Sequence, residues 1–193
     1  MTVYDSNRLR ELVSQQSLRF GDFTLASGKK AKFYLDCRQL TLHPQGANQV
    51  GAGMLNLLQS GSLGPALPDA IGGMAIGADP ITAATITLAG QQGLNLKGFI
   101  VRKEAKQHGM GRQVEGPVVA GESVVIVEDV VTSGGSALAA VEAARQFGLE
   151  VRGILAVIDR LEGGRQAIEA AGLTLHTLLT VEDFGISPAG SWQ

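Results

Sequence analysis

The sequence predicts an α/β fold in which a parallel β-sheet is flanked by helices, with a small N-terminal hood attached. From residue 69 onward, short apolar runs alternate with helical stretches: apolar 69–73, helical 80–92, apolar 98–102, apolar 123–127, helical 136–147, apolar 153–159, helical 164–171 and apolar 174–180. Strands that are apolar on both faces indicate a parallel sheet covered by helices on both sides. The first 40 residues lack this rhythm. We therefore expect a single domain over residues 1–193, with residues 1–43 forming the hood.

The segments that precede the sheet show helical and strand patterns of their own. Residues 4–16 place leucine and valine side chains on one face, which predicts a helix. The next stretch alternates in polarity and turns at Ser27-Gly28, as expected for one or two short strands with a loop. Pro44 then opens a second helix, which ends before Gly61.

Composition and charge exclude several classes of function. The chain has 193 residues, of which 45% are apolar and 18% charged, and its net charge is −2. That balance provides no basic field for nucleic acid or for an anionic membrane. The N-terminal residues lack the apolar run of a signal peptide, and no stretch approaches the roughly 18 apolar residues of a membrane span. Because Cys37 is the single cysteine, no intrachain disulfide can form, and we expect a reducing cytoplasm.

The stretch "VVIVEDVVTSGGSA", residues 124–137, joins a strand expected at 123–127 to the helix that follows. Ligands of such sheets bind beyond the carboxyl ends of the strands. Residues 132–136 offer hydroxyl groups and a run of amides near a helix N-terminus, which suits a phosphate. Glu128 and Asp129 would repel that phosphate, so we expect them to accept hydrogen bonds from vicinal sugar hydroxyls. A generic turn with a capping serine is the alternative, but the acidic pair and the hydroxyl groups favour a ribose that carries a 5-phosphate.

A second junction, "IGGMAIGADPITAA", covers residues 71–84. Asp79 is expected to cap a helix whose first residue is Pro80. Gly72, Gly73 and Gly77 form a permissive loop before it, which suits a second phosphate group or, alternatively, only a tight turn.

A third junction, residues 101–116, is rich in cations and contains two glycines. The cationic side chains are those of Arg102, Lys103, Lys106, His108 and Arg112. The segment reads either as a solvated charged loop or as a mobile loop that closes over a leaving pyrophosphate and neutralises its charge.

A fourth junction places Asp159 and Arg160 at the end of a buried strand. An arginine at such a position is costly unless it meets an anion. The anion is either a ligand or a structural partner, Asp159 or Glu162.

Together these stretches resemble a known family. "VVIVEDVVTSGGSA" resembles the phosphoribosyl diphosphate (PRPP) signature of type I phosphoribosyltransferases. The stretches "FTLASGKKAKFYLD" and "RKEAKQHGMG" and the Arg160 junction resemble orotate phosphoribosyltransferases, over roughly residues 8–185. The resemblance implies transfer of the 5-phosphoribosyl group from PRPP to orotate, giving orotidine 5′-monophosphate and pyrophosphate in pyrimidine (UMP) biosynthesis. It also implies Mg²⁺ bound mainly through PRPP, without a dedicated protein metal site, and a homodimer that shares the cationic loop between subunits.

The resemblance assigns site residues by position. Those implied to bind PRPP are Arg102, Lys103, Lys106, His108, Glu128, Asp129, Val130, Val131, Thr132, Ser133, Gly134, Gly135 and Ser136. Those implied to be catalytic are Lys106, His108 and Asp129, and those implied to bind orotate are Thr132 and Arg160, with Phe33 and Tyr34 near the base. One position departs from the pattern: some members carry a lysine before the hood Ser-Gly, where this chain has Ala26, with Lys29 and Lys30 close by.

Two other functions are compatible with the same fold. One is a phosphoribosyltransferase for another base, such as a purine, which the hood stretch and the lysine-rich loop disfavour. The other is a non-catalytic PRPP-sensing regulator, which would have no need of Lys106 and His108.

Overall fold

The computed structural model describes residues 3–24, 30–104 and 113–187. The helices are α1 Ser6–Gln16, α2 Arg38–Thr41, α3 Pro44–Gln59, α4 Ala78–Gln91, α5 Gly135–Phe147 and α6 Gly164–Ala170, with a 3₁₀ turn at Val181–Phe184. The strands are β1 Leu18–Thr24, β2 Lys30–Leu35, β3 Ala70–Met74, β4 Lys97–Val101, β5 Val114–Glu115, β6 Ser123–Val131, β7 Glu150–Asp159 and β8 Leu175–Thr180.

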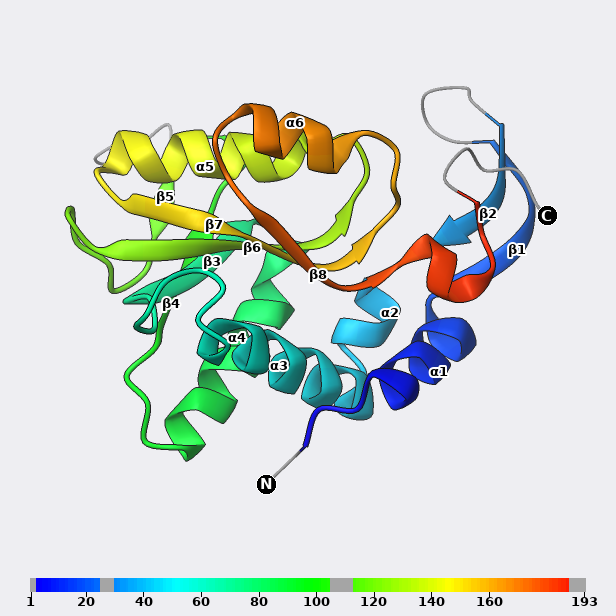
Figure 1. The fold of residues 1–193 in the computed structure, drawn as a ribbon, viewed down its shortest axis with the longest axis horizontal. Helices are drawn as coiled ribbons and strands as arrows, with labels where there is room; N and C mark the ends of the chain where they lie inside the picture. The colour runs from blue at the N-terminus through cyan, green and yellow to red at the C-terminus, as the bar shows by residue number, and fades with distance from the viewer. Residues whose placement is uncertain (1–2, 25–29, 105–112, 188–193) are drawn as a thin grey trace.

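The central sheet has six strands in the order β5-β4-β3-β6-β7-β8. Every neighbouring pair in it is parallel except β4 and β5, which are antiparallel. Helices α5 and α6 lie over one face, and α3 and α4 lie over the other (Figure 1). The buried side chains accordingly form two clusters, one on each face of the sheet. The expected α/β class with a parallel sheet is confirmed, apart from its antiparallel edge strand.

The N-terminal segment consists of helix α1 and a β-hairpin. Asp5 caps α1, because its Oδ1 accepts hydrogen bonds from the backbone N of Asn7 at 2.9 Å and of Arg8 at 3.1 Å. The predicted strands are an antiparallel hairpin of β1 and β2. The turn expected at Ser27-Gly28 lies outside the described residues.

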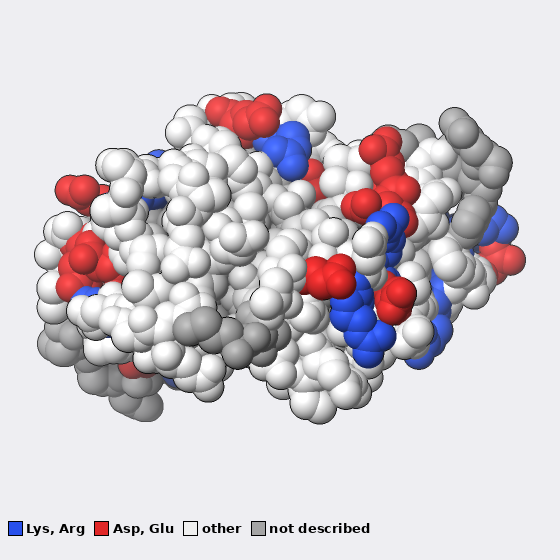
Figure 2. All heavy atoms as spheres, turned by 60° about the horizontal axis from the view of Figure 1, so that its bottom comes forward, with Lys and Arg blue, Asp and Glu red and all other residues white. Residues whose placement is uncertain are grey.

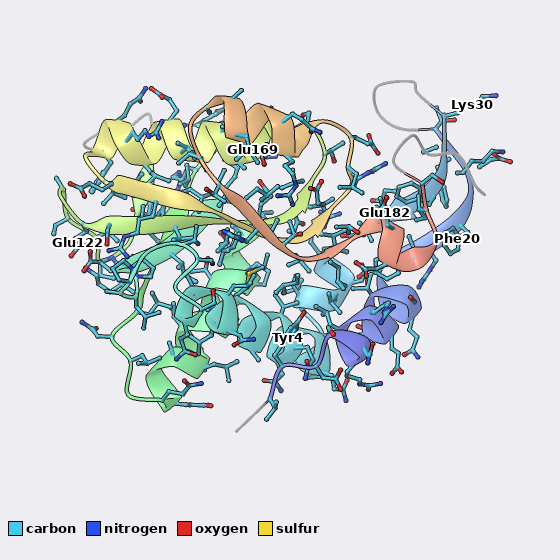
Figure 3. All side chains as sticks on the ribbon, viewed as in Figure 1. Tyr4, Phe20, Lys30, Glu122, Glu169 and Glu182 are labelled. Carbon is cyan, nitrogen blue, oxygen red and sulfur yellow. The ribbon has the colours of Figure 1, made fainter. Side chains whose placement is uncertain are left out.

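The hairpin lies at the end of the molecule toward which the parallel strands run. Phe20 and Lys30 mark the hairpin, whereas Glu122, which precedes β6, lies at the opposite end (Figure 3). The carboxyl ends of the strands therefore point toward the hairpin. This is the edge at which parallel sheets bind ligands.

Three expectations about boundaries were wrong, and two short elements were missed. Helix α4 begins at Ala78 with Gly77 as its N-cap, so Asp79 lies in the first turn and does not cap the helix. Strand β6 continues to Val131, because pairing with β7 holds its last residues in the sheet. Strand β7 starts at Glu150, before its apolar run. The short elements α2 and β5 were not predicted, since neither is long enough to show a period.

In the view of Figure 2, charged side chains lie at the left edge, along the upper rim and over the right half, with a wide uncharged area to the left of the centre. Helix α3 has no charged residue, and Asp79 is the sole charged residue of α4. None of the described helices has the length and apolar character needed to cross a membrane.

Candidate active site

Two adjoining hollows lie at the carboxyl ends of the strands. The larger has a volume of about 700 Å³. It is bordered by the ends of β3, β4 and β6, by the start of α2 and by Ser136. The smaller, of about 260 Å³, is formed by residues 128–137. Because Glu128, Asp129 and Ser136 line both hollows, one extended ligand can occupy the two together.

The smaller hollow has the geometry of a phosphate cradle. Gly134 adopts a left-handed conformation (φ 80°) as the N-cap of α5, and no described side chain caps this helix. The amides of the first turn of α5 are thus available to an anion. The cradle is braced from behind by α6, because a Cβ on Gly164 would lie 2.4 Å from Val131 Cγ1 and 2.6 Å from Thr132 O. The predicted phosphate residues are therefore brought together.

The acidic pair is set by β6, on the strand and not after it as we expected. Glu128 is only 5% exposed, and its Oε2 has no hydrogen-bond partner among the described residues. Asp129 is held by its own strand, since Oδ1 accepts a hydrogen bond from Val130 N at 2.8 Å. Burial, together with the Asp129 carboxylate, raises the pKa of Glu128 to about 8. At neutral pH the Glu128 carboxyl group is therefore mainly protonated.

The junction after β3 forms another wall of the larger hollow. Gly72 and Gly73 lie inside β3, where an added Cβ would come within 2.1 Å of Phe99 O and of Val127 O, so they serve strand packing and do not form a phosphate loop. The loop itself is Ala75–Gly77. Ile76 is 69% exposed there, and a Cβ on Gly77 would lie 3.0 Å from Asp129 Oδ1. This wall lies against the acidic pair but contains no cation.

The ends of the cationic segment are held together by β4 and β5. Arg102 N donates to Gln113 O at 2.9 Å, and Gln113 Nε2 donates to Arg102 O at 3.2 Å. Arg102 Nη1 also lies 3.9 Å from Glu115 Oε1. Arg102 and Lys103, two of the residues predicted to bind PRPP, line the larger hollow. Lys106, His108 and Arg112 lie outside the described residues.

Arg160 lies between the end of β7 and the hairpin. Its guanidinium is 4.6 Å from the centre of the Phe33 ring, and its Nε and Nη2 lie 2.8 and 2.7 Å from Glu162 Oε1. Of the two structural partners we considered, Glu162 is the one observed, because Asp159 instead lies 3.3 Å from Arg165 Nη2. The Arg160 guanidinium thus borders the hood residue Phe33, and its ion-pair partner Glu162 is exposed.

The hood residues are only partly described. Phe33 is buried beneath Arg160, and the Tyr34 ring packs 5.7 Å from that of Phe23. Lys30 begins β2, whereas Ala26 and Lys29 lie outside the described residues.

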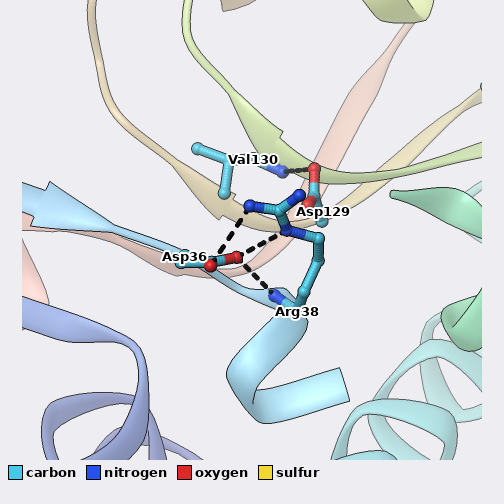
Figure 4. Close-up of polar contacts among 4 residues, drawn as sticks. All are labelled: Asp36, Arg38, Asp129 and Val130. Atoms are coloured by element: carbon cyan, nitrogen blue, oxygen red, sulfur yellow. Dashed lines mark hydrogen bonds and ion pairs between the residues drawn. The ribbon is translucent and has the colours of Figure 1, made fainter. Parts of the chain in front are cut away.

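One arginine of the larger hollow, Arg38, and the aspartate that holds it, Asp36, were missed at the level of sequence. Arg38, the first residue of α2, lines the hollow together with Glu128 and Asp129. Its guanidinium is held by Asp36, with Nε 2.8 Å from Oδ1 and Nη2 3.2 Å from Oδ2 (Figure 4). The available signal was an aspartate and an arginine two residues apart, directly after the apolar end of a strand.

Comparisons with known proteins agree with this geometry. Residues 65–171 match the family described as phosphoribosyl transferase domain. A curated relative from Rhodopirellula baltica, named orotate phosphoribosyltransferase, is 60% identical over 178 residues, which cover 92% of each chain. The Mycobacterium tuberculosis orotate phosphoribosyltransferase crystallised with Fe(III) dicitrate superposes with a TM-score of 0.81 at 39% identity, covering 93% of this chain and 98% of that one. The same enzyme in complex with PRPP gives 0.77 at 35% identity, with the same coverage.

Proposed function

The chain belongs to the orotate phosphoribosyltransferases, and from that premise we propose which of its residues bind each part of the two substrates. The reaction transfers the 5-phosphoribosyl group of PRPP to orotate in pyrimidine biosynthesis. This identity sets aside the two alternatives, another base and a non-catalytic regulator. The observation that carries the assignment below is the pair of hollows that share Glu128, Asp129 and Ser136.

The 5-phosphate occupies the cradle of residues 132–136. Thr132, Ser133 and Ser136 offer hydroxyl groups, and Gly134 and Gly135 let the backbone amides approach the phosphate oxygens. The residues proposed to hold this part of PRPP are thus contiguous, from Glu128 to Ser136, with Val130 and Val131 supplying backbone at the strand end.

The ribose hydroxyls face Glu128 and Asp129. Asp129 accepts hydrogen bonds as a carboxylate, and a protonated Glu128 both donates and accepts. Breaking the bond from ribose C1 to diphosphate leaves positive charge on the sugar, which the Asp129 carboxylate stabilises from the hydroxyl side.

The diphosphate extends toward the end of β4, where Arg102 and Lys103 line the larger hollow. Lys106 and His108 follow in the same segment and are proposed to neutralise the charge that develops on the leaving group. Each well-placed donor of this kind contributes about 3–4 kcal/mol to the transition state.

Orotate is proposed to bind between the hairpin and the end of β7. Its carboxylate takes the place of Glu162 on the Arg160 guanidinium, which binds carboxylates through two parallel hydrogen bonds. Thr132 completes this subsite, and Phe33 and Tyr34 border the ring. As the bond from ribose C1 to diphosphate breaks, the ring nitrogen of orotate bonds to C1, and its N–H proton passes to the leaving diphosphate or to solvent.

Mg²⁺ is proposed to enter with PRPP. Within the described residues, no group of three or more His, Cys, Asp or Glu side chains is arranged to hold a metal ion. Carboxylate oxygens suit Mg²⁺, and the Asp129 carboxylate at the hollow fits a cation carried by the substrate. When bound, Mg²⁺ supplies positive charge to the diphosphate oxygens.

A homodimer with the cationic loop shared between subunits is part of the same proposal. The uncharged surface over α3 and α4 supports it, because two copies can meet there without like-charge repulsion. Residues 1–43 are proposed to act as a hood within one domain, and the free, buried Cys37 agrees with a cytoplasmic location.

The decisive experiment is a spectrophotometric assay of orotate consumption with PRPP and Mg²⁺. We expect turnover with orotate, none with adenine or hypoxanthine, and loss of activity when Mg²⁺ is chelated. The site assignment is tested in the same assay with Thr132→Val and Ser136→Ala, which should raise the KM for PRPP. If both variants keep the parent KM, the phosphate does not lie in this cradle.

Loop sharing is tested by mixing two inactive variants, Lys106→Ala and Arg160→Ala, and allowing the subunits to exchange. If the loop acts in the neighbouring site, each mixed dimer contains one site with both residues intact. Random mixing makes about half of the dimers mixed, so about a quarter of the parent activity should return. A mixture that exchanges subunits but stays inactive would show that each loop serves its own chain.

A further inference from the structure

We infer that Arg38 binds the diphosphate end of PRPP and that Asp36 positions it for this contact. The inference rests on the proposed placement of PRPP in the two hollows. It adds to the site Asp36, which follows β2, and Arg38, the first residue of α2, both far in sequence from the strand junctions.

The first support is the position of Arg38. It lines the larger hollow together with the Ala75–Gly77 loop, Asp129 and the end of β4. Figure 4 shows its side chain extending from the start of α2 toward the part of β6 that contains Asp129. The side chain is 53% exposed, so a ligand in the hollow can reach the guanidinium.

The second support is the way in which Asp36 holds the guanidinium. Asp36 takes Nε at 2.8 Å and Nη2 at 3.2 Å, and it also accepts from Arg38 N at 3.2 Å. These bonds fix one edge of the guanidinium plane and leave the Nη1 group without a described partner. Arg38 in turn holds the pKa of Asp36 below its usual value, so the pair stays ionised at neutral pH. The burial of Cys37 between them anchors the backbone.

The third support is the distribution of charge around the hollow. The Ala75–Gly77 wall contributes no cation, and β6 contributes two carboxyl groups. Among the described residues, the arginine and lysine side chains that line the hollow are Arg38, at the start of α2, and Arg102 and Lys103, directly after β4. Diphosphate is the most highly charged part of PRPP, and an arginine fork matches its oxygens in geometry as well as in charge.

The carboxylate of orotate is the other anion that Arg38 could meet. Arg160, the proposed orotate ligand, does not line the larger hollow, whereas the two cations at the end of β4 do. Arg38 therefore belongs with the diphosphate cations by position.

The test measures binding of three separate ligands by calorimetry: magnesium pyrophosphate, ribose 5-phosphate and orotate. We expect Arg38→Met to weaken pyrophosphate by roughly tenfold to a hundredfold, as for loss of a charge-assisted hydrogen bond, and to leave the other two within about threefold. Arg38→Lys should recover part of the loss. Asp36→Asn should weaken the same ligand to a smaller extent, because Arg38 remains but is less well oriented. In steady state, Arg38→Met should raise the KM for PRPP and leave that for orotate near the parent.

Arg8→Met is the matched control. Arg8 is also an exposed arginine held by a carboxylate, with Nη1 3.1 Å from Glu11 Oε2, but it lies on α1 away from the hollow. It should bind all three ligands as the parent does.

Several outcomes would overturn the inference. Unchanged pyrophosphate binding in Arg38→Met would do so, and a loss confined to orotate would show that Arg38 holds the base. Equal losses for all three ligands with a lower melting temperature would make Arg38 a structural residue. If Asp129→Asn and Ser136→Ala leave ribose 5-phosphate binding unchanged, the proposed placement of PRPP itself fails. If they weaken it while Arg38→Met has no effect, the placement stands and only the role of Arg38 fails.

Discussion

Substituting Glu128 by glutamine should flatten the dependence of stability on pH. The carboxyl group of Glu128 is buried beside Asp129, which raises its pKa from the usual 4.5 to about 8. Glutamine is nearly isosteric with the protonated acid but has no proton to lose. The variant therefore isolates the contribution of this single ionisation to the free energy of unfolding.

The expected magnitude follows from the two pKa values. Between pH 4.5 and pH 8 the unfolded chain has lost the Glu128 proton and the native protein has kept it, so raising the pH favours unfolding. The contribution of the protonated Glu128 to the free energy of unfolding is fully present below pH 4.5 and is lost as the pH rises to about 8. From pH 6 to pH 8 the loss is about 2 kcal/mol, at about 1.4 kcal/mol for each pH unit with the last unit only partly effective.

Urea unfolding of the ligand-free protein at pH 6 and at pH 8 measures this loss. With a urea dependence of about 2 kcal/mol per molar, the contribution of Glu128 lowers the parent midpoint by about 1 M at the higher pH. Glu128→Gln should lack that decrease. Glu169→Gln, a change of an exposed glutamate on α6, is the matched control and should behave as the parent does.

The reasoning is refuted if parent and Glu128→Gln show the same difference in midpoint between the two pH values. In that case Glu128 ionises in the native protein as it does in the unfolded chain. Other interactions of the Glu128 carboxylate would then offset the cost of burying its charge in the native protein.

Three further substitutions separate the subsites. Arg160→Ala should weaken orotate by about tenfold or more and leave PRPP affinity near that of the parent, because its proposed partner is the orotate carboxylate; equal losses in calorimetric titrations of both substrates would make Arg160 structural. Asp129→Asn should show the reverse pattern, raising the KM for PRPP more than that for orotate, and a larger effect on orotate would contradict its assignment to the ribose. Gly164→Ala should lower stability by about 1–3 kcal/mol and weaken ribose 5-phosphate, because its Cβ would collide with Val131 and with Thr132 O behind the cradle; a variant with parent stability and parent affinity would show that this contact is not tight.

The sequence predicted the long elements of the fold because each one carries its own period. The strands of the sheet other than β5, together with helix α1 and helices α3 to α6, were recognisable from apolar runs and helical spacing. The errors occurred where tertiary contacts decide the structure. Strand β6 outlasts its apolar run because β7 pairs with it as far as Val131, and the two-residue β5 exists through its pairing with β4.

The site residues likewise divide into those that are consecutive in the chain and those that only tertiary contacts bring together. The phosphate cradle was predictable, since its hydroxyls, its glycines and its helix start are consecutive in the chain. The partner of Arg160 was left open between two acidic neighbours, and only the fold selects Glu162, because Asp159 is fully buried against Arg165. Arg38 could not be recognised, since its closeness to Asp129 depends on the packing of α2 beside the sheet.

The acidic pair shows most clearly what a sequence cannot contain. Two adjacent carboxyl groups look equivalent in the chain, and both were expected to accept hydrogen bonds from the ribose. On a strand, however, neighbouring side chains point to opposite faces, so one of a pair is directed inward. Glu128 is 5% exposed and keeps its proton at neutral pH, while Asp129 is tied to Val130 N at the edge of the hollow. A protonated Glu128 adds no negative charge to the site proposed to receive the anionic PRPP, and its neutral carboxyl group has a donor that a carboxylate lacks. The two residues, adjacent in the chain, therefore differ in burial and in hydrogen bonding, and we expect them to contribute differently to the binding of PRPP.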